Sequence, residues 1–307
     1  MNTTEPKSAP AIDSKKLELL QSLLTPAPAS LNEEQIQQIH DRIVEQVKAT
    51  LTPEPVHVTV TAPSGKVTVS GEQHHLFPDL LDLLSEGELV FLTGGPGSGK
   101  TTAVEEAAKA LELPFYSLSL SAQTGTHALL GYQDAHGRFV STDFRRAFED
   151  GGVFCLDEVD NGNPNVLAVL NTALANGHCS FADGMVARHA DFRLVATGNT
   201  VGRGGSAQFV GRNPIDAATL DRFAMIHWDY DMAFEQKLAG DPEWTGYVQS
   251  IRSAAESLGS KLIVSPRASM KGAKMRRKGW SKQKCADAYI WKGLSQDERR
   301  KIEAALA

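Results

Sequence analysis

The chain has 307 residues, of which 41% are hydrophobic and 22% charged, enough apolar material for one large or two smaller globular domains. No apolar run approaches the roughly 20 residues of a membrane span, and the N-terminus is polar, so we expect a cytoplasmic protein with no membrane partner. The three cysteines show neither metal nor disulfide spacing, and the net charge of -6 argues against a surface that binds nucleic acid throughout, although a local basic groove is compatible with it.

The first 73 residues predict an N-terminal extension in two parts. Residues 1–30 are rich in Ser, Thr, Pro and Ala, which favours a flexible tail. The alternative is a short amphipathic helix over 12–24 that docks on a partner. Residues 31–73 predict a helix capped by Asn32 and stopped by Pro53, followed by a β-hairpin of alternating valines.

The next segment contains a glycine-rich loop, Gly94–Thr101, that matches G-x-x-x-x-G-K-[ST]. A short apolar strand is predicted over 88–93 before it, and an Ala- and Glu-rich helix over 102–111 after it. Strand, loop and helix together let backbone N–H groups and a helix N-terminus surround a polyphosphate. The alternative is a glycine turn that precedes a lysine by chance.

For this loop we expect Lys100 to reach the β- and γ-phosphates of ATP, and the Thr101 hydroxyl to ligate Mg²⁺. The expected nucleotide-binding residues of the loop are Gly94, Gly95, Pro96, Gly97, Ser98, Gly99, Lys100, Thr101 and Thr102.

A second motif joins an apolar run to two acids. Residues 153–156 predict a strand buried on both faces, and Asp157 and Glu158 stand at its C-terminal end. We expect Asp157 to bind the metal ion, directly or through water, and Glu158 to orient and polarise the attacking water. Cys155, inside the strand, is interpreted as a core residue, because no base stands nearby in the sequence.

Other elements are predicted around these motifs. Asn163-Pro164 starts a helix that ends at Asn176-Gly177. The remaining predicted elements are a strand over 115–120, a hairpin near 131–140, a helix over 142–149, and a hairpin over 179–188 with Asp183-Gly184 as its turn.

A third apolar strand, over 192–198, ends at Asn199. If it neighbours the Asp157 strand, Asn199 is expected to position the γ-phosphate or the water; the alternative is an ordinary strand-ending Asn. Arg222 lies at a helix end before the strand 224–228, where, in a ring of subunits, it could reach a neighbour's γ-phosphate, an effect of about 10³ to 10⁵ in rate. Arg212 is a second candidate, for which an ordinary ion pair is the preferred interpretation.

The C-terminal part, 231–307, predicts helices without strands. Arg267 follows Pro266 in the first turn of one of them, where a cation opposes the helix dipole, so we expect it to face a phosphate. The basic segment 267–284 is either a nucleic-acid track or, more commonly for such runs, a solvated face. The predicted helices cover 231–238, 244–258, 266–277, 281–291 and 295–306.

These motifs resemble those of the AAA+ ATPases, and within them the MoxR/CobS-like, dynein-related branch, including CobS-like ATPases of bacteria and their phages. The resemblance covers roughly residues 75–290 and implies an α/β P-loop NTPase fold, with a parallel-sheet αβα core over 74–230 and a helical lid over 231–307. The residues that carry it are Gly94–Thr101 (Walker A), 153–158 (Walker B), 194–199 (sensor 1), 220–223 (arginine finger) and 265–267 (sensor 2).

The resemblance further implies a homo-hexameric ring that binds ATP and Mg²⁺ between subunits and remodels a partner protein, often one with a von Willebrand A domain. Two alternatives stay open: a nucleic-acid-dependent motor or loader that uses the segment 267–284, and a scaffold that hydrolyses ATP slowly. The intact Asp157-Glu158 pair counts against the scaffold. No Asn-Lys-x-Asp motif is present, which favours ATP over GTP.

Overall fold

The computed structural model describes residues 39, 59–62, 65–69, 71–205 and 209–306, and the fold below belongs to the unit Pro53–Ala307. The predicted tail over 1–30 and the helix predicted after Asn32 lie outside the described residues, apart from Ile39, which is helical. The predicted N-terminal hairpin is present: β1 (Thr59–Ala62) and β2 (Gly65–Thr68) pair antiparallel. None of the helices in the described ranges is long and apolar enough to cross a bilayer.

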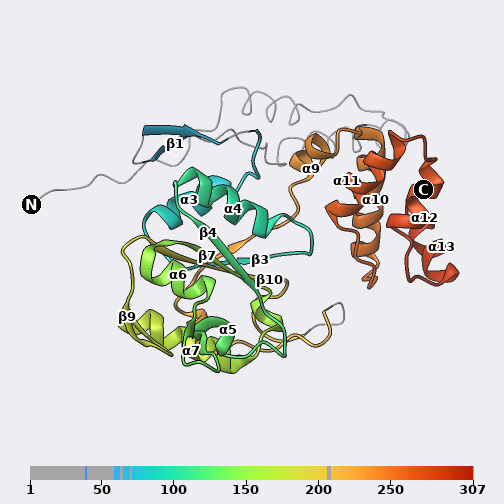
Figure 1. The fold of residues 1–307 in the computed structure, drawn as a ribbon. Coiled ribbons are helices and arrows are strands. Elements are labelled where there is room, and N and C mark those ends of the chain that lie inside the picture. Colours follow the sequence, from blue (N-terminus) through green and yellow to red (C-terminus); the bar gives the residue numbers. More distant parts are fainter. Residues whose placement is uncertain (1–38, 40–58, 63–64, 70, 206–208, 307) are drawn as a thin grey trace, which may run out of the picture. The chain divides into compact units, whose positions relative to one another are not determined.

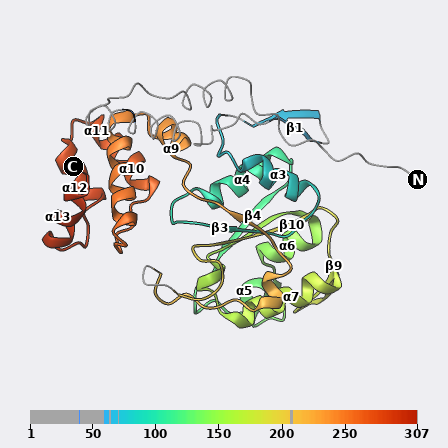
Figure 2. The same cartoon turned by 180° about the vertical axis from the view of Figure 1, so that it is seen from behind.

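A five-stranded parallel sheet forms the centre of the fold, in the order β11-β3-β10-β7-β4. Figures 1 and 2 show α3 and α4 on one face of this sheet and α5, α6 and α7 on the other. Its strands are β3 (Val90–Thr93), β4 (Phe115–Ser119), β7 (Gly152–Asp157), β10 (Phe192–Gly198) and β11 (Ala224–His227). The helices around it are α3 (Phe77–Ser85), α4 (Lys100–Ala110), α5 (His127–Leu130), α6 (Asp143–Asp150), α7 (Pro164–Asn176) and α8 (Ala217–Leu220), with the 3₁₀ turn η1 (Val159–Asn161).

The apolar runs in the sequence become the inner strands because helices cover both faces of the sheet. All four residues of β3 are buried, as are the first five of β7. On one face α3 and α4 pack against β3 and β7, with Phe77 and Leu80 in the cluster. On the other face, Phe144 and Phe148 of α6 pack with Phe154 and α7.

The strand order determines where polar groups meet. Gly198 of β10 lies opposite Thr93 of β3, and Ala196 lies opposite Leu156 of β7. The carboxyl ends of these three neighbouring strands therefore lie side by side at one edge, where parallel α/β sheets place their ligands.

Two small hairpins are inserted between core elements, as predicted: β5 (Tyr132–Gln133) with β6 (Phe139–Val140), and β8 (His178–Phe181) with β9 (Gly184–Ala187). The predicted turn of the second hairpin, Asp183-Gly184, is wrong by one residue. Phe181 pairs with Gly184, so the turn is 182–183. The short helix α5 before the first hairpin was also not predicted from the sequence.

The C-terminal helices have a hydrophobic cluster of their own, centred on Trp244, Val248 and Ile251. Within it Glu235 and Arg252 form an ion pair whose side chains are only 2% and 4% exposed, and Ser269 also donates to Glu235. The helices are α9 (Met232–Ala239), α10 (Pro242–Ser257), α11 (Pro266–Arg276), α12 (Lys282–Tyr289) and α13 (Gln296–Ala304).

We predict that Glu235→Ala destabilises the helical part strongly, because it leaves the Arg252 guanidinium buried without its two 2.8 Å contacts. Such truncations cost about 3–5 kcal/mol of unfolding free energy. The matched control is Glu303→Ala, which removes an exposed pair with Arg299 and should cost less than about 1 kcal/mol. Denaturant unfolding followed by circular dichroism measures both, and equal losses would contradict the prediction.

Candidate functional site

The Gly94–Thr101 loop connects β3 to α4 and is held by the ends of neighbouring strands. The Gly94 N–H donates to the Gly198 carbonyl at 3.3 Å. From the segment after β11, Trp228 Nε1 donates to the Ser98 carbonyl at 3.1 Å and Tyr230 Oη donates to the Pro96 carbonyl at 3.0 Å. These hydrogen bonds fix the shape of the loop. Trp228 and Tyr230 were not identified from the sequence.

Lys100 lies in the first turn of α4 and is buried against this loop. Its Nζ donates to the carbonyls of Gly94 and Gly95 at 2.9 and 3.0 Å, and lies 3.4 Å from Asn199 Oδ1. Burial lowers the pKa of Lys100 to about 8, and the negative charge of Asp157 opposes this shift. An anion bound at the loop would favour the charged lysine.

Asp157 and Glu158 lie where β7 ends, beside β10. Asp157 Oδ1 accepts hydrogen bonds from the Thr197 hydroxyl and, at 3.1 Å, from the Glu158 N–H. Glu158 has φ 55° and ψ 44°, and Glu112 is the only other non-glycine with positive φ among the described residues. A left-handed backbone is unfavourable for such a residue and often accompanies a functional site.

Asp160, two residues further on, was missed from the sequence although it is the best-bonded carboxylate here. It is fully buried, and its Oδ2 accepts from the Asn199 N–H at 3.1 Å and from the N–H and hydroxyl of Thr200, both at 2.9 Å. Its Oδ1 accepts from Arg212 Nη1 at 3.0 Å. The sequence feature that could have identified Asp160 is the third acid in the run Asp-Glu-Val-Asp, residues 157–160.

One cavity of about 320 Å³ brings most of the predicted residues together. The Thr101 hydroxyl and the Asp157 carboxylate, oxygen donors of the kind that Mg²⁺ prefers, both belong to it, so the donor set fits this ion. Arg267 packs on the loop from α11: a Cβ on Gly97 would lie 3.1 Å from its Cγ. The predicted residues that line the cavity are Pro96, Gly97, Gly99, Lys100, Thr101, Thr102, Asp157, Glu158, Asn199 and Arg267.

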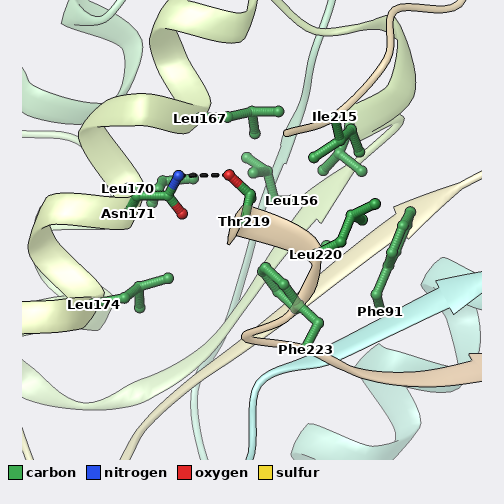
Figure 3. Close-up of a pocket in the computed structure, with 12 residues that line it drawn as sticks. Phe91, Leu156, Leu167, Leu170, Asn171, Leu174, Ile215, Thr219, Leu220 and Phe223 are labelled. Carbon is green, nitrogen blue, oxygen red and sulfur yellow. Dashed lines mark hydrogen bonds between the residues drawn. The ribbon is translucent and has the colours of Figure 1, made fainter. Parts of the chain in front are cut away.

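Arg222 lies elsewhere: it is exposed and does not line this cavity. Its neighbours Leu220 and Phe223 point into an apolar pocket between α7, α8 and the sheet (Figure 3). There Asn171 of α7 donates to the Thr219 hydroxyl at 2.5 Å. The segment carrying Arg222 is thus anchored to the core by the residues on either side.

A second cavity, of about 520 Å³, adjoins the first and shares Gly97, Gly99 and Thr102 with it. His74 stacks on Trp228 with ring centroids 4.1 Å apart, and both rings line this cavity with Tyr230 and Phe234. Burial lowers the pKa of His74. His74, His75 and Asp231 lie close enough to share a metal ion, but both ring nitrogens of His74 are already engaged, by Asp229 and Leu76.

The basic segment 267–284 is partly neutralised within the helical part. Arg276 pairs with Asp241 and Glu243 at 2.8 and 2.7 Å. Arg277 donates to the Ala239 carbonyl, and Lys282 lies 3.8 Å from Glu243. This part of the chain is therefore less available to a nucleic-acid backbone than its sequence suggested.

The fold and the loop between β3 and α4 define a P-loop NTPase. Residues 89–223 match the model of the AAA domain, dynein-related subfamily. Residues 89–223 are therefore an AAA domain of the kind found in the AAA+ ATPases, a family whose members bind nucleotide, and the predicted α/β P-loop fold is confirmed. The MoxR/CobS-like resemblance fits this subfamily.

Among known proteins, the chain is similar to an uncharacterized protein of Staphylococcus aureus strain USA300, with 26% identity over 166 residues, 50% of this chain and 60% of that protein. An uncharacterized protein of Staphylococcus epidermidis is 25% identical over 166 residues, again 50% of this chain and 60% of that protein. The chain thus spans about 60% of the length of these curated relatives.

Two solved structures are also similar. NtrX from Brucella abortus has 13% identity and a TM-score of 0.45, covering 97% of this chain and 58% of that one. A RuvB mutant from Thermotoga maritima has 19% identity and a TM-score of 0.40, and the match covers 75% of this chain and 67% of that one.

We predict that Gly94→Ala destabilises the fold more than Gly99→Ala. A Cβ on Gly94 would lie 2.1 Å from the Trp228 carbonyl oxygen, so the loop or the segment after β11 must move. Gly99 has φ 88° with nothing near its Cβ, so alanine there bears only the left-handed strain of about 1–2 kcal/mol. Thermal unfolding of both variants tests this, and an equal or smaller loss for Gly94→Ala would contradict it.

Proposed function

We propose that the protein binds and hydrolyses ATP with Mg²⁺ at the subunit interfaces of a homo-hexameric ring, and that hydrolysis drives the remodelling of a partner protein. The observation that carries this proposal is one cavity, in which Lys100, Asp157, Glu158 and Asn199 converge on the phosphate-binding loop. The three free cysteines are all buried, which supports the cytoplasmic location that we propose.

Within one subunit, the loop would receive the phosphates. Lys100 would exchange its bonds to the Gly94 and Gly95 carbonyls for phosphate oxygens, and Arg267 would approach the same charge from α11. Thr101 and Asp157 would hold Mg²⁺, which would neutralise phosphate charge. Because these groups line one cavity, a single bound nucleotide would contact them together.

The base of ATP would occupy the neighbouring cavity of about 520 Å³. This cavity is continuous with the loop through Gly97, Ser98 and Thr102, and the partly exposed rings of Tyr230 and Phe234 form its aromatic wall. Such a wall offers stacking area to a purine.

Groups at the carboxyl ends of β7 and β10 would carry out hydrolysis. Glu158 would accept a hydrogen bond from the attacking water, and Asn199, 3.4 Å from Lys100, would position water and γ-phosphate. Arg222 is exposed and outside its own subunit's cavity, which supports a role at a neighbour's nucleotide.

The remodelling role rests on the resemblance, which also suggests a partner with a von Willebrand A domain. The two inserted hairpins support a protein partner. Gln133 of β5 donates to the Ala182 carbonyl of the second hairpin. Arg145 of α6 also bridges the two hairpins, because it lies over the Phe139 ring of the first and binds Asp183 of the second at 2.7 Å, so the hairpins form one unit. This unit exposes Tyr132 and Met185. A nucleic-acid-dependent activity is the alternative, and the internal ion pairs of Arg276 count against it.

We predict that Glu158→Gln keeps ATP binding but lowers kcat by about 10²–10⁴-fold, because the amide cannot accept the proton of water. Binding is measured with a fluorescent ATP analogue and turnover by phosphate release. The control is Glu105→Gln on the exposed face of α4, which should hydrolyse ATP at the normal rate. A Glu158→Gln protein with unchanged turnover would remove Glu158 from this role.

We predict that Arg222→Ala binds ATP normally and loses about 10³-fold or more in turnover. Mixing it with Lys100→Ala subunits, which keep Arg222 but lack a working loop, should restore activity at interfaces that combine an intact loop with an intact Arg222. If mixing restores nothing, Arg222 does not act in trans.

The partner is tested by capture from a lysate of the native host with the ATP-bound Glu158→Gln protein. A stoichiometric protein that is retained only with ATP and after nuclease treatment supports remodelling. Nucleic acid that is released by high salt, without such a protein, supports the alternative.

A further inference from the structure

Arg212 makes contacts that neither the motifs nor the family assignment explain. Its side chain is 14% exposed, and Nη1 lies 3.0 Å from Asp160 Oδ1 and 3.4 Å from Glu158 Oε2. One guanidinium of the loop before α8 thus contacts the proposed catalytic carboxylate and the buried carboxylate beside it. Both carboxylates belong to the same subunit as Arg212.

The backbone next to Arg212 is held firmly. The Asn213 N–H donates to the Asp160 carbonyl at 2.7 Å, and Asn213 Nδ2 donates to the Gly162 carbonyl at 2.9 Å. Three groups therefore join this loop to the turn after β7. A side chain anchored in this way can fix the position of whatever it contacts.

Asp160 requires such a cation. It is fully buried, and a buried carboxylate is costly unless charge and hydrogen bonds compensate it. Arg212 supplies the charge, while Asn199 and Thr200 supply hydrogen bonds to the other oxygen. The carboxylate therefore connects Arg212 to the backbone that carries the Asn199 side chain.

Glu158 is the least constrained member of the group, with a side chain that is 41% exposed. Its side-chain contacts with Arg212 Nη1 at 3.4 Å and with Asn161 Nδ2 at 3.5 Å both involve Oε2. Fixing one oxygen limits the rotamers of the side chain and leaves Oε1 to accept a hydrogen bond from water. Small displacements of a reacting group are costly, since 1 Å can cost about 10²-fold in rate.

We propose that Arg212 is a positioning residue of the hydrolytic site that acts within its own subunit. It holds Glu158 through Oε2 and, through Asp160, keeps Glu158 in register with Asn199. This inference rests on the proposed function, because it assumes that Glu158 serves hydrolysis. It also separates two nearby arginines: Arg222 is exposed and serves a neighbour, whereas Arg212 is already engaged by carboxylates of its own subunit.

The test compares Arg212→Ala and Arg212→Lys with the wild type. We expect Arg212→Ala to lower kcat by about 10–10²-fold while KM and ATP affinity change little, because the residue does not line the nucleotide cavity. Arg212→Lys should recover part of the loss, since an ammonium can still pair with Asp160. Circular dichroism and thermal unfolding establish that each variant is folded; if Arg212→Ala is not, the Arg212→Lys comparison decides.

Mixing separates action within a subunit from action across an interface. Arg212→Ala mixed with Lys100→Ala should remain as slow as Arg212→Ala alone, while Arg222→Ala in the same mixture recovers. If Arg212→Ala recovers activity in this mixture, the proposal is overturned. Turnover of Arg212→Ala alone at or above the wild-type rate would also overturn it, because the contact with Glu158 would then be neutral or inhibitory.

A second measurement does not depend on turnover. Amide exchange at Asn199 and Thr200, whose N–H groups donate to Asp160, should be faster in Arg212→Ala. If the wild type itself hydrolyses no ATP, the proposed function fails and the catalytic part of this inference fails with it. If amide exchange is then also unchanged in Arg212→Ala, the structural link between Arg212 and Asn199 is rejected as well. If the wild type is active and Arg212→Ala keeps the wild-type kcat, this inference is rejected and the proposed function stands.

Discussion

The buried carboxylate of Asp160 is the constraint on which the geometry of the site depends. Removing such a charge from water costs several kcal/mol unless the fold compensates it. Compensation here comes from the segment after β10 and from the loop before α8, through Asn199, Thr200 and Arg212. Three segments that are distant in sequence must therefore adopt one arrangement for the protein to be stable, and that arrangement places the Asn199 side chain beside Lys100.

The phosphate loop is held by a different means, namely hydrogen bonds from aromatic side chains. Trp228 and Tyr230 donate to loop carbonyls, and Lys100 donates to two more. The aromatic donors can stay in place when a ligand arrives, whereas the lysine can exchange its partners. Burial has already lowered the pKa of Lys100, so a bound anion and the charged lysine would stabilise each other. Trp228 and Tyr230 thus hold the shape of the loop, while Lys100 can change its hydrogen-bond partners.

The sequence was most informative where chemistry and periodicity coincide. The apolar strands and their polar endings predicted that Asn199 would lie beside Asp157 if their strands were neighbours, and β10 does pair with β7. It could not predict contacts that depend on tertiary packing. Nothing local to His74 indicates that it stacks on Trp228, more than 150 residues away. The hairpin turn was misplaced for a local reason: cross-strand register, and not the Asp-Gly pair, determined it.

The two arginines before β11 show how burial can separate residues that look alike in sequence. Arg212 and Arg222 both stand in the polar stretch between β10 and β11, and both were candidates for the same role. Asp160 provides a buried counter-charge for Arg212. The segment around Arg222 is anchored instead by the apolar contacts of Leu220 and Phe223 and by the hydrogen bond of Thr219, which leave the Arg222 side chain exposed. A cation that is already neutralised has little electrostatic energy left to give to a neighbour's phosphate. The same residue type is therefore suited to hold a carboxylate at one position and to meet a separate anion at the other.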